Sequence, residues 1–528
     1  MIKTKVKLPY NYTQESLTGA LTAELPIESS EIKSLRIIKR TLNLSDKNNI
    51  HYDAIIGAEL SPEREAGLLK MKKKVSPQEN LTLNIPLVKM DIRPVVIGAG
   101  PAGLFAALLL SEAGARPILY ERGLSVEERE KKVNLFHTLG VLDPECNVQY
   151  GEGGAGTYSD GKLKLGSLDK YNYKVLSEFV EAGAPEDILF ASGAHLGTDK
   201  LPGIVKKIRE KILSLGGEIH FCARLTDIRV RNGKIVGGSV IENGESFDFE
   251  TDNIILATGH SAHDVFEMLK SSGALLEPRG FGIGVRIEHP REYIDEIVYG
   301  KTPPSDIGSA SYHLVTHLKG GRSVYSFCMC PGGVVVPATS EEGGIVTNGM
   351  SEYARHADNS NAAFLVSVTP NDFGSEDALS GLTLQRSIER TAFEIAGANY
   401  KAPATTMNAF MHREKSADFP SVKPSYALGV ESIAPEEYLP EFITESIREA
   451  IPDFDDWMKG FYYPDAVLTG PETRTTSPIR VTRNESFESV TISGLYPTGE
   501  GAGYSGGIVS SARDGLIIAE KILEKYQK

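Results

Sequence analysis

The stretch PVVIGAGPAGLFAALLLSEAGARPILYERG, residues 94–123, decides the fold of this chain. The apolar run Val95 to Ile97 is typical of a buried strand, and the Ala- and Leu-rich run after it predicts a helix. Glycines occupy the turn between the two with the spacing GxGxxG. This order of strand, glycine turn and helix is that of a βαβ unit that binds a dinucleotide.

Each glycine of the turn has its own physical role. Gly98 permits the tight turn, Gly100 lets backbone N–H groups approach a pyrophosphate, and Gly103 lets the helix pack close to the strand. The helix N-terminus favours the diphosphate because its first N–H groups have no intrahelical partner. A second strand, Pro117 to Tyr120, ends at Glu121, where a carboxylate can accept a ribose hydroxyl. The alternative, a glycine-rich turn before an ordinary core helix, leaves this acid without a role. The predicted contacts in this stretch are Gly98, Gly100, Pro101, Ala102, Gly103, Glu121 and Arg122.

Length and composition indicate an ordinary globular protein. The chain has 528 residues, 41% of them hydrophobic and 24% charged, and this length allows two to four domains. The N-terminal sequence MIKTKVKLPYNYTQES has no apolar signal segment, and no apolar stretch is long enough to span a membrane. Four cysteines cannot form a disulfide framework in so long a chain, which favours a reducing compartment. We therefore expect a cytoplasmic protein without a membrane partner.

Charge is distributed unevenly along the chain. The formal net charge of −14 argues against a nucleic-acid partner for the whole molecule. Residues 1–90, however, carry fourteen Lys and Arg against ten Asp and Glu. Their strand- and helix-like segments predict a small α+β domain, for which a ferredoxin-like arrangement is one alternative. The lysine run from Lys70 to Lys74 follows a helix that begins near Pro62, and we interpret it as a solvated helix end rather than a nucleic-acid patch.

A second glycine-rich stretch, GEGGAGTYSDGKL at residues 151–163, predicts a loop that faces a cofactor. It holds too many glycines for a helix or strand interior, and its main chain can lie flat against a ligand. The alternative is a flexible surface loop, but such linkers lack this mixture of Tyr, Glu, Asp and Lys. The predicted cofactor contacts are Gly153, Gly154, Ala155 and Gly156.

Two later segments predict further contacts with the same cofactor. A buried strand, residues 253–256, ends at Ala257-Thr258-Gly259, and the sequence TGEGAGYSGGI near the C-terminus leads into a helix over residues 509–525. There, a strand end presents a carboxylate and a helix presents free N–H groups, which suits a polyol chain and the electron-rich end of a flavin ring. The predicted contacts are Ala257, Thr258, Gly259, Gly499, Glu500, Gly506, Gly507 and Ile508.

Together these segments resemble the FAD-dependent oxidoreductases of the glutathione-reductase-like, two-dinucleotide-binding-domain superfamily. Over most of the chain they are similar to a bacterial group within it, the FAD-dependent dehydrogenase-like proteins. The group resemblance rests on the 151–163 stretch, on ATGHSAHDVFEML at residues 257–269, on GFGIGVRIEHP at 280–290, on FCMCPGG at 327–333 and on ETRTTSPIRV at 472–481. It implies FAD as the cofactor, although the superfamily usually has Asp where this chain has Glu500.

The resemblance implies an α/β fold in which a Rossmann-type FAD-binding domain is assembled from separate segments. We expect the small α+β domain at residues 1–90, the main part of the FAD-binding domain at 91–279, an inserted substrate or cap domain at 280–481 and the C-terminal part of the FAD-binding domain at 482–528.

The inserted region holds the candidate catalytic residues. Cys328 or Cys330 can present a thiolate beside the flavin, but in a regular strand the two share a face and are small core residues, which we slightly favour. Glu472, Arg474 and Arg480 lie just before the C-terminal FAD segment, which predicts a bidentate clamp on an anionic substrate or, as the alternative, a structural ion pair. No metal site is expected.

We expect an FAD-dependent oxidoreductase that exchanges hydride with a small substrate. Residues 259–499 contain no second strand, GxGxxG turn and Ala-rich helix, so NADH or NADPH is expected to dock only transiently. Two alternatives stay open. The basic N-terminal module favours an RNA-modifying flavoprotein, which the acidic remainder disfavours, and the third possibility is a flavin-binding interaction or sensor protein without turnover.

Overall fold

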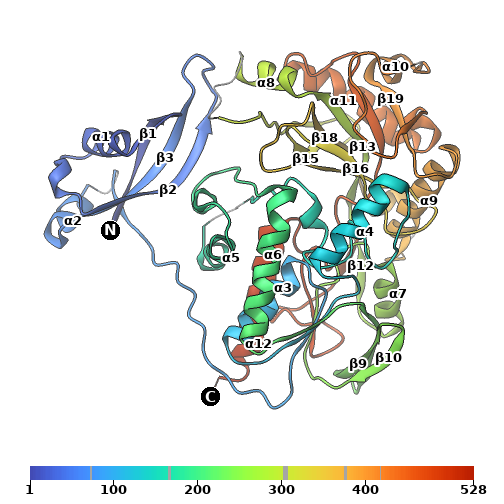
Figure 1. Ribbon diagram of the computed structural model, residues 1–528, viewed down its shortest axis with the longest axis horizontal. Helices are drawn as coiled ribbons and strands as arrows, with labels where there is room; N and C mark the ends of the chain where they lie inside the picture. Colours follow the sequence, from blue (N-terminus) through green and yellow to red (C-terminus); the bar gives the residue numbers. More distant parts are fainter. Residues whose placement is uncertain (72–73, 165–167, 301–306, 374–376, 417, 528) are drawn as a thin grey trace.

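The N-terminal module is a small α+β unit, seen at the left of Figure 1. The computed structural model describes residues 1–71, 74–164, 168–300, 307–373, 377–416 and 418–527, so part of the predicted lysine run lies outside the described residues. The module runs β1 (Ile2–Pro9), α1 (Gln14–Glu24), β2 (Ser34–Asn43), β3 (His51–Glu59), α2 (Pro62–Leu69) and β4 (Ser76–Pro77). Its sheet has the order β2-β3-β1-β4 with antiparallel pairs, which is the ferredoxin-like βαββαβ arrangement.

This module contacts the rest of the chain through the edge strand β2. The Arg40 N–H donates to the Phe190 carbonyl, and the Ser192 N–H donates to the Arg40 carbonyl, each at 2.7 Å. The Arg40 guanidinium also lies 5.3 Å from the centre of the Phe190 ring. These contacts pair part of an otherwise open sheet edge. A long connection over residues 78–94 then leads to the nucleotide-binding domain (Figure 1).

The nucleotide-binding sheet has the strand order β23-β11-β5-β6-β7, and its neighbouring strands are parallel. Its members are β5 (Val95–Ile97), β6 (Ile118–Tyr120), β7 (Glu218–His220), β11 (Ile254–Leu256) and β23 (Leu495–Pro497). The last strand comes from the C-terminal end of the chain and pairs with β11, residue Ile254 opposite Leu495. The expected Rossmann-type domain built from separate segments is therefore confirmed.

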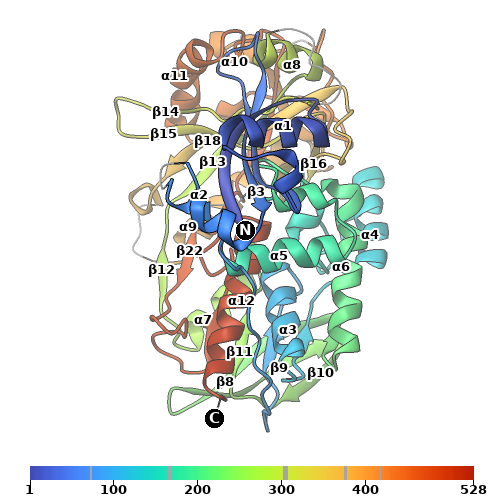
Figure 2. The same cartoon turned by 90° about the vertical axis from the view of Figure 1, so that its left-hand side faces the viewer.

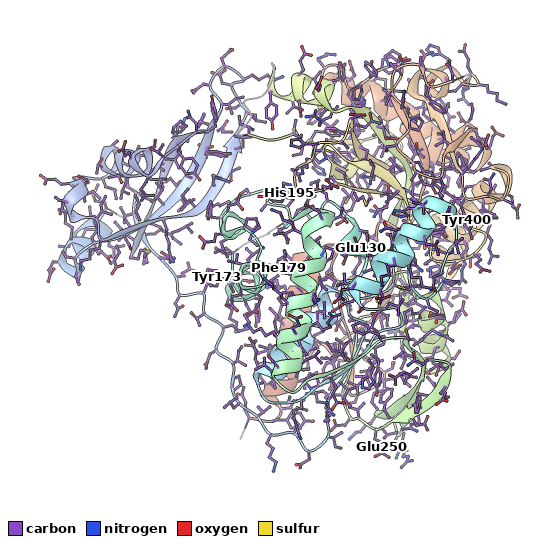
Figure 3. All side chains as sticks on the ribbon, viewed as in Figure 1. Glu130, Tyr173, Phe179, His195, Glu250 and Tyr400 are labelled. Carbon is purple, nitrogen blue, oxygen red and sulfur yellow. The ribbon has the colours of Figure 1, made fainter. Side chains whose placement is uncertain are left out.

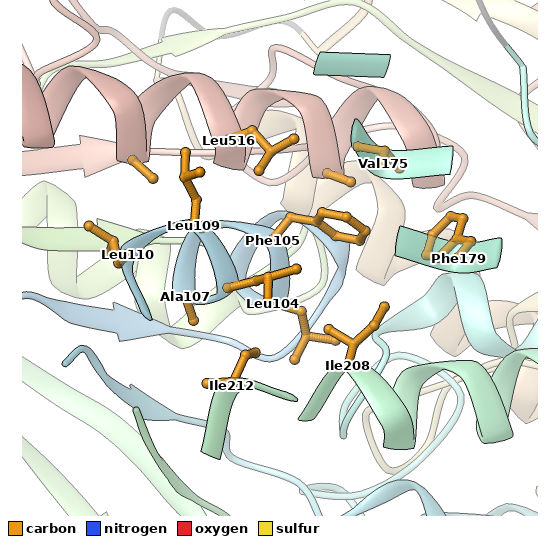
Figure 4. Close-up of a cluster of buried hydrophobic side chains, with 14 of the residues drawn as sticks. Leu104, Phe105, Ala107, Leu109, Leu110, Val175, Phe179, Ile208, Ile212 and Leu516 are labelled. Carbon is orange, nitrogen blue, oxygen red and sulfur yellow. The ribbon is translucent and has the colours of Figure 1, made fainter. Parts of the chain in front are cut away.

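Helices pack around this sheet. They are α3 (Pro101–Glu112), α4 (Val126–Leu139), α5 (Lys170–Glu181), α6 (Gly197–Ser214) and α12 (Ile508–Glu524). α3 is apolar all round because α12, α6 and the sheet enclose it. In Figure 4 Phe105 and Leu109 of α3 lie between Leu516 of α12 and Ile208 of α6. This packing fixes the helix that begins at the glycine turn.

A separate sheet with the order β10-β9-β8 lies between β7 and β11 in the chain. It consists of β8 (Ala223–Arg231), β9 (Lys234–Glu242) and β10 (Glu245–Phe249), and α7 (His263–Ser271) follows β11. β7 and β8 are separated by a break in the chain near Cys222, whose φ is 53°. The break sends β7 into the nucleotide-binding sheet and β8 into the second sheet.

The described residues of 280–481 form an antiparallel sheet with helices on it, at the top of Figures 1 and 2. The sheet order is β14-β15-β18-β13-β21-β19-β20, and only the pair β19-β20 among these described strands is parallel. Helix α11 packs on the buried central strands β13 and β18. Strands β12 and β22 pair where the chain enters and leaves this region. The elements are β12 (Leu276–Pro278), β13 (Phe281–Pro290), α8 (Arg291–Tyr299), β14 (Val315–His317), β15 (Ser323–Cys330), β16 (Val334–Pro337), β17 (Thr347–Met350), β18 (Asn359–Val368), α9 (Ser380–Ile395), β19 (Ala402–Thr406), α10 (Met407–His412), β20 (Val430–Ser432), α11 (Glu441–Trp457), β21 (Val467–Glu472) and β22 (Ile479–Val481).

The inserted region and the nucleotide-binding domain meet along α4 and α6. The ring of Tyr400 lies beside α4 (Figure 3), edge-on to Phe136 with 5.2 Å between ring centres. Near the start of α6, the His195 ring stacks on Tyr353 at 5.1 Å. Among the described residues, no helix combines the length and apolarity that crossing a membrane requires.

Candidate active site

A cavity of about 300 Å³ lies between the carboxyl ends of β5, β6, β11 and β23 and the inserted region. Open parallel sheets bind their ligands at this edge. One wall consists of the glycine turn after β5, the 151–163 loop and the glycine segment after β23. The opposite wall comes from β15, β17 and the end of β21. Segments far apart in sequence therefore enclose one space.

The glycine turn shows why each glycine stands at its position. A Cβ at Gly98, whose φ is 102°, would lie 2.4 Å from the Ala257 carbonyl oxygen, and one at Gly103 would lie 1.8 Å from the Gly98 oxygen. At Gly100 the nearest atom to such a Cβ is Gly154 Cα, at 3.8 Å. Gly98 and Gly100 line the cavity together with Pro101 and Ala102, whereas Gly103 packs the helix onto the turn behind the wall.

Two helix N-termini open into the cavity. Gly100 is the N-cap of α3 and Gly507 is the N-cap of α12, and no side chain of the described residues caps either helix. The first N–H groups of each helix are therefore available to a ligand, and the helix dipoles favour negative charge there. Gly506, Gly507 and Ile508 line the wall at α12, as predicted contacts.

Glu121 lies at the cavity but is already engaged by the backbone. Its Oε2 accepts the Ala99 N–H at 2.7 Å, and its Oε1 accepts the N–H groups of Gly123 at 2.8 Å and Gly151 at 2.9 Å. The carboxylate thus ties the glycine turn to the 151–163 loop. Sequence spacing predicted only a ribose contact for this acid. The neighbouring Arg122 also lines the cavity and pairs with Asp264 at 2.8 Å.

A buried arginine that the sequence reasoning missed shapes the 151–163 loop. The Arg129 guanidinium donates to backbone carbonyls of the loop and of the segment before it, including Glu152 at 2.7 Å and Gly154 at 2.9 Å. Of the predicted loop contacts, Gly154, Ala155 and Gly156 line the cavity. Gly153 packs within the loop, because a Cβ there would lie 2.1 Å from Thr157 Oγ1.

The ends of β11 and β23 complete this wall. Ala257, Thr258 and Gly259 line it from β11, and Gly499 and Glu500 line it from β23. Burial raises the pKa of Glu500 to about 8, and the charge of the nearby Cys328 thiolate acts in the same direction. Glu500 therefore holds a proton more strongly than an exposed carboxyl group.

The opposite wall holds the two cysteines, which differ in their exposure to the cavity. The pairing of β15 with β18 shifts register between Phe327 and Cys330, and Cys328 within this bulge has a φ of 40°. Cys328 lines the cavity, while Cys330 is fully buried. The expectation of two core thiols therefore holds for Cys330, whereas Cys328 reaches the cavity from the bulge.

The two thiols differ in their electrostatics. A hydrogen bond from Cys330 lowers the pKa of Cys328, and the nearby Lys162 and Arg286 act in the same direction. The same contact, together with burial, raises the pKa of Cys330. A thiolate is the reactive form of cysteine, so Cys328 is the more reactive member of the pair.

Glu472 and Arg474 do not pair with each other. Glu472 contacts Arg286, whose Nη1 lies 3.1 Å from Oε2, and burial raises the pKa of Glu472 to about 7. Arg474 forms a bidentate pair with Glu389, at 2.9 Å from Nε to Oε1 and 2.7 Å from Nη2 to Oε2. Its Nη1 donates to Ser340 Oγ at 2.6 Å. Both residues line the cavity, and Arg474 is in a structural ion pair, which was the predicted alternative to a substrate clamp.

Further side chains of the wall were not predicted. His260 lines the cavity, and burial lowers its pKa to about 3, so the ring is neutral. Lys162 and Lys164 line it from the end of the 151–163 stretch and just beyond. Their placement was hidden because the sequence does not show which face of this loop meets the inserted region. In the described part of the chain, no group of three or more His, Cys, Asp or Glu side chains could hold a metal ion.

Comparison with known families accounts for both halves of the cavity. Residues 92–281 match the family model "pyridine nucleotide-disulphide oxidoreductase", and residues 280–475 match "FAD-dependent protein, C-terminal domain-like". The boundary between the two matches lies between β12 and β13, at the start of the inserted region.

Relatives extend this similarity to the whole chain. An uncharacterized protein of Clostridium beijerinckii is 44% identical over 97% of this chain and 96% of its own length. Thioredoxin reductase of Bacillus subtilis is 31% identical over 28% of this chain and 48% of its own. Among solved structures, 3-ketosteroid-Δ4-(5α)-dehydrogenase from Rhodococcus jostii RHA1 superimposes with a TM-score of 0.36 at 13% identity, covering 83% of this chain and 98% of that one.

The cavity fits FAD on its own geometry. A Cβ at Gly98 would collide with the Ala257 carbonyl at the end of β11, so the turn there must be glycine. Because Gly100 has no side chain, the main chain beside it is open to the cavity and forms a cradle for a diphosphate. The uncapped N-termini of α3 and α12 supply N–H donors for negative charge. The chain therefore belongs to the family of FAD-dependent oxidoreductases that join a pyridine nucleotide-disulphide oxidoreductase domain to an FAD-dependent C-terminal domain.

Proposed function

We propose that the protein is a dehydrogenase that exchanges hydride between FAD and a small organic substrate bound in the cavity beside β15, β17 and β21. The observation that carries the proposal is the composition of the two walls: glycine segments and helix N-termini on one side face Cys328, Glu472 and other polar side chains on the other. FAD supplies the hydride acceptor or donor when bound, and the chain supplies binding, orientation and proton transfer.

The ionisable groups of the wall suit proton transfer near neutral pH. Glu472, with its pKa raised to about 7, can release or take up a proton at little cost. Arg286 fixes the orientation of Glu472 and donates to the Cys328 carbonyl at 3.0 Å. Glu500, in the glycine-rich wall, also holds a proton, whereas the lowered pKa of Cys328 favours the thiolate and His260 is neutral.

The fold of the inserted region supports the proposed source of electrons. Its described residues form an antiparallel sheet in which Phe281–Pro290 is a strand, so the sequence GFGIG does not open a second nucleotide-binding helix. NADH or NADPH would then reach the flavin only from the cavity mouth, without a dedicated adenosine site. The organic substrate is the other source.

Anaerobic stopped-flow absorbance tests the proposal. The holoenzyme is mixed with NADH, with NADPH and with a panel of small alcohols, amines and acids, and bleaching of the long-wavelength flavin band is followed. We expect slow reduction by both nicotinamides, weak saturation and little preference between them, with at least one organic compound reducing the flavin faster. Tight, fast and selective reduction by one nicotinamide contradicts the proposal.

A further inference from the structure

We propose that Lys162 and Lys164 form a binding site for the carboxylate of the substrate, so that the substrate class is the small organic acids. This inference rests on the proposed function, because it places an acid in the same cavity. It assigns anion binding to a segment other than Arg474, to which the sequence pointed.

Lys162 is half-buried, and its Nζ atom is buried without a hydrogen-bond acceptor among the described residues. Its Nζ lies 3.3 Å from Asp160 Oδ2, but this contact does not have hydrogen-bond geometry. Asp160 is already satisfied, since it accepts from Arg355 Nε at 2.9 Å and Nη2 at 2.5 Å and from Ser351. A buried ammonium that donates no hydrogen bond is costly. An anionic ligand in the cavity that Lys162 lines would satisfy it.

Lys164 places a second ammonium at the same wall. Lys162 forms an isolated bridge with His195, and the buried Leu163 stands between the two lysines in the chain. Both lysines line the cavity. The Lys164 Nζ lies 5.5 Å from the centre of the Phe327 ring, and Phe327 lines the cavity as well. This ring offers an apolar surface beside the two cations.

The other charged groups of the cavity leave the lysines as its anion-binding residues. The Nε and Nη2 atoms of Arg474 donate to Glu389, and Glu121 accepts backbone N–H groups. Glu472 pairs with Arg286. A neutral donor completes the set: the buried Thr475 Oγ1 lines the same cavity and has no hydrogen-bond partner among the described residues.

Two anions could meet this lysine pair, the carboxylate of a substrate and the diphosphate of FAD. The uncapped N-termini of α3 and α12 already provide N–H groups suited to a diphosphate, and they begin at glycines that line the cavity. Lys162 instead acts electrostatically on Cys328, which belongs to β15 in the opposite wall. We therefore assign the lysines to the substrate.

Ligand titrations on the oxidised holoenzyme test the assignment without turnover. Benzoate is the probe, since it carries one carboxylate on an apolar ring, and benzamide is its neutral counterpart. Binding is read from the shift of the flavin absorbance bands and from calorimetry. We expect saturable binding of benzoate and none of benzamide, and we expect Lys162→Met and Lys164→Met each to weaken benzoate binding about tenfold or more. Lys459→Met, at an exposed helix end, is the matched control.

The remaining outcomes overturn the inference. Equal binding of benzoate and benzamide, or benzoate binding that Lys162→Met leaves unchanged, removes the carboxylate site. Loss of FAD from Lys162→Met with Lys164→Met assigns the lysines to the cofactor instead. Failure of the proposed function is recognised separately, because it appears as selective reduction by a nicotinamide in stopped flow, whether or not benzoate binds.

Discussion

Glu121→Ala should destabilise the protein even when FAD is absent. The carboxylate is buried, with a relative exposure of 5%, and accepts the N–H groups of Ala99, Gly123 and Gly151. A hydrogen bond to a charged group contributes about 1.5–3 kcal/mol, and removing the acceptor leaves buried donors unsatisfied. Because such losses are not additive and water can enter from the cavity, we expect the free energy of unfolding to fall by about 3 kcal/mol or more.

Thermal unfolding of the flavin-free protein measures this effect. For a domain of about 150–250 residues, a loss of 3 kcal/mol corresponds to a decrease in Tm of about 6–12 °C. Glu130→Ala, on the exposed face of α4 (Figure 3), is the control and should leave Tm unchanged. An unchanged Tm in Glu121→Ala together with weaker FAD binding would refute the reasoning, because it would leave Glu121 with the ribose contact alone.

The remaining predictions concern the inserted region and the C-terminal segment. The pKa of Cys328 is lowered, whereas burial raises the pKa of Cys222, so iodoacetamide should alkylate Cys328 at a lower pH. Peptide mass spectrometry measures the two alkylation profiles, and equal pH profiles would contradict the prediction. Arg474→Met leaves Glu389 as an unpaired buried charge and should lower the free energy of unfolding, measured in urea, by about 3–5 kcal/mol. The double variant with Glu389→Leu should recover most of this loss, and a stable single variant would count against a structural pair. The folded-state pKa of Glu500 is about 8 and lies above its ordinary value of 4.5, so the flavin-free protein should lose stability as pH rises between these values. Glu500→Gln should flatten this dependence of Tm on pH. An identical slope in the variant would show that Glu500 is not the group whose titration causes the loss.

The sequence predicted those parts of the fold that depend on local pattern. Strand, glycine turn and helix at residues 94–112 follow from hydrophobic period and from the steric needs of Gly98 and Gly103, which act over a few residues. The family resemblance predicted that the C-terminal segment belongs to the same domain, and its strand β23 pairs with β11. Most of the predicted cofactor contacts line one cavity for this reason.

The partners of buried charged groups could not be predicted. Arg474 pairs with Glu389 on α9, and Glu472 pairs with Arg286 on β13. Each pair joins residues more than eighty positions apart, and no local pattern selects one acid among many. The bulge at Cys328 was equally hidden, since it shows only in the pairing of β15 with β18. These contacts decide which side chains face the substrate and which are structural.

The FAD content of Gly100→Val tests most directly that FAD lies in this cavity against the glycine turn. A side chain at Gly100 meets Gly154 Cα at 3.8 Å and otherwise points into the cavity, so valine should fill the diphosphate position while the protein stays folded. Gly19→Val, on the exposed face of α1 where a Cβ meets open space, is the control. We predict that wild type and Gly19→Val purify with FAD and that Gly100→Val purifies folded and colourless. Full FAD occupancy in Gly100→Val would contradict the account, because the diphosphate would then lie elsewhere.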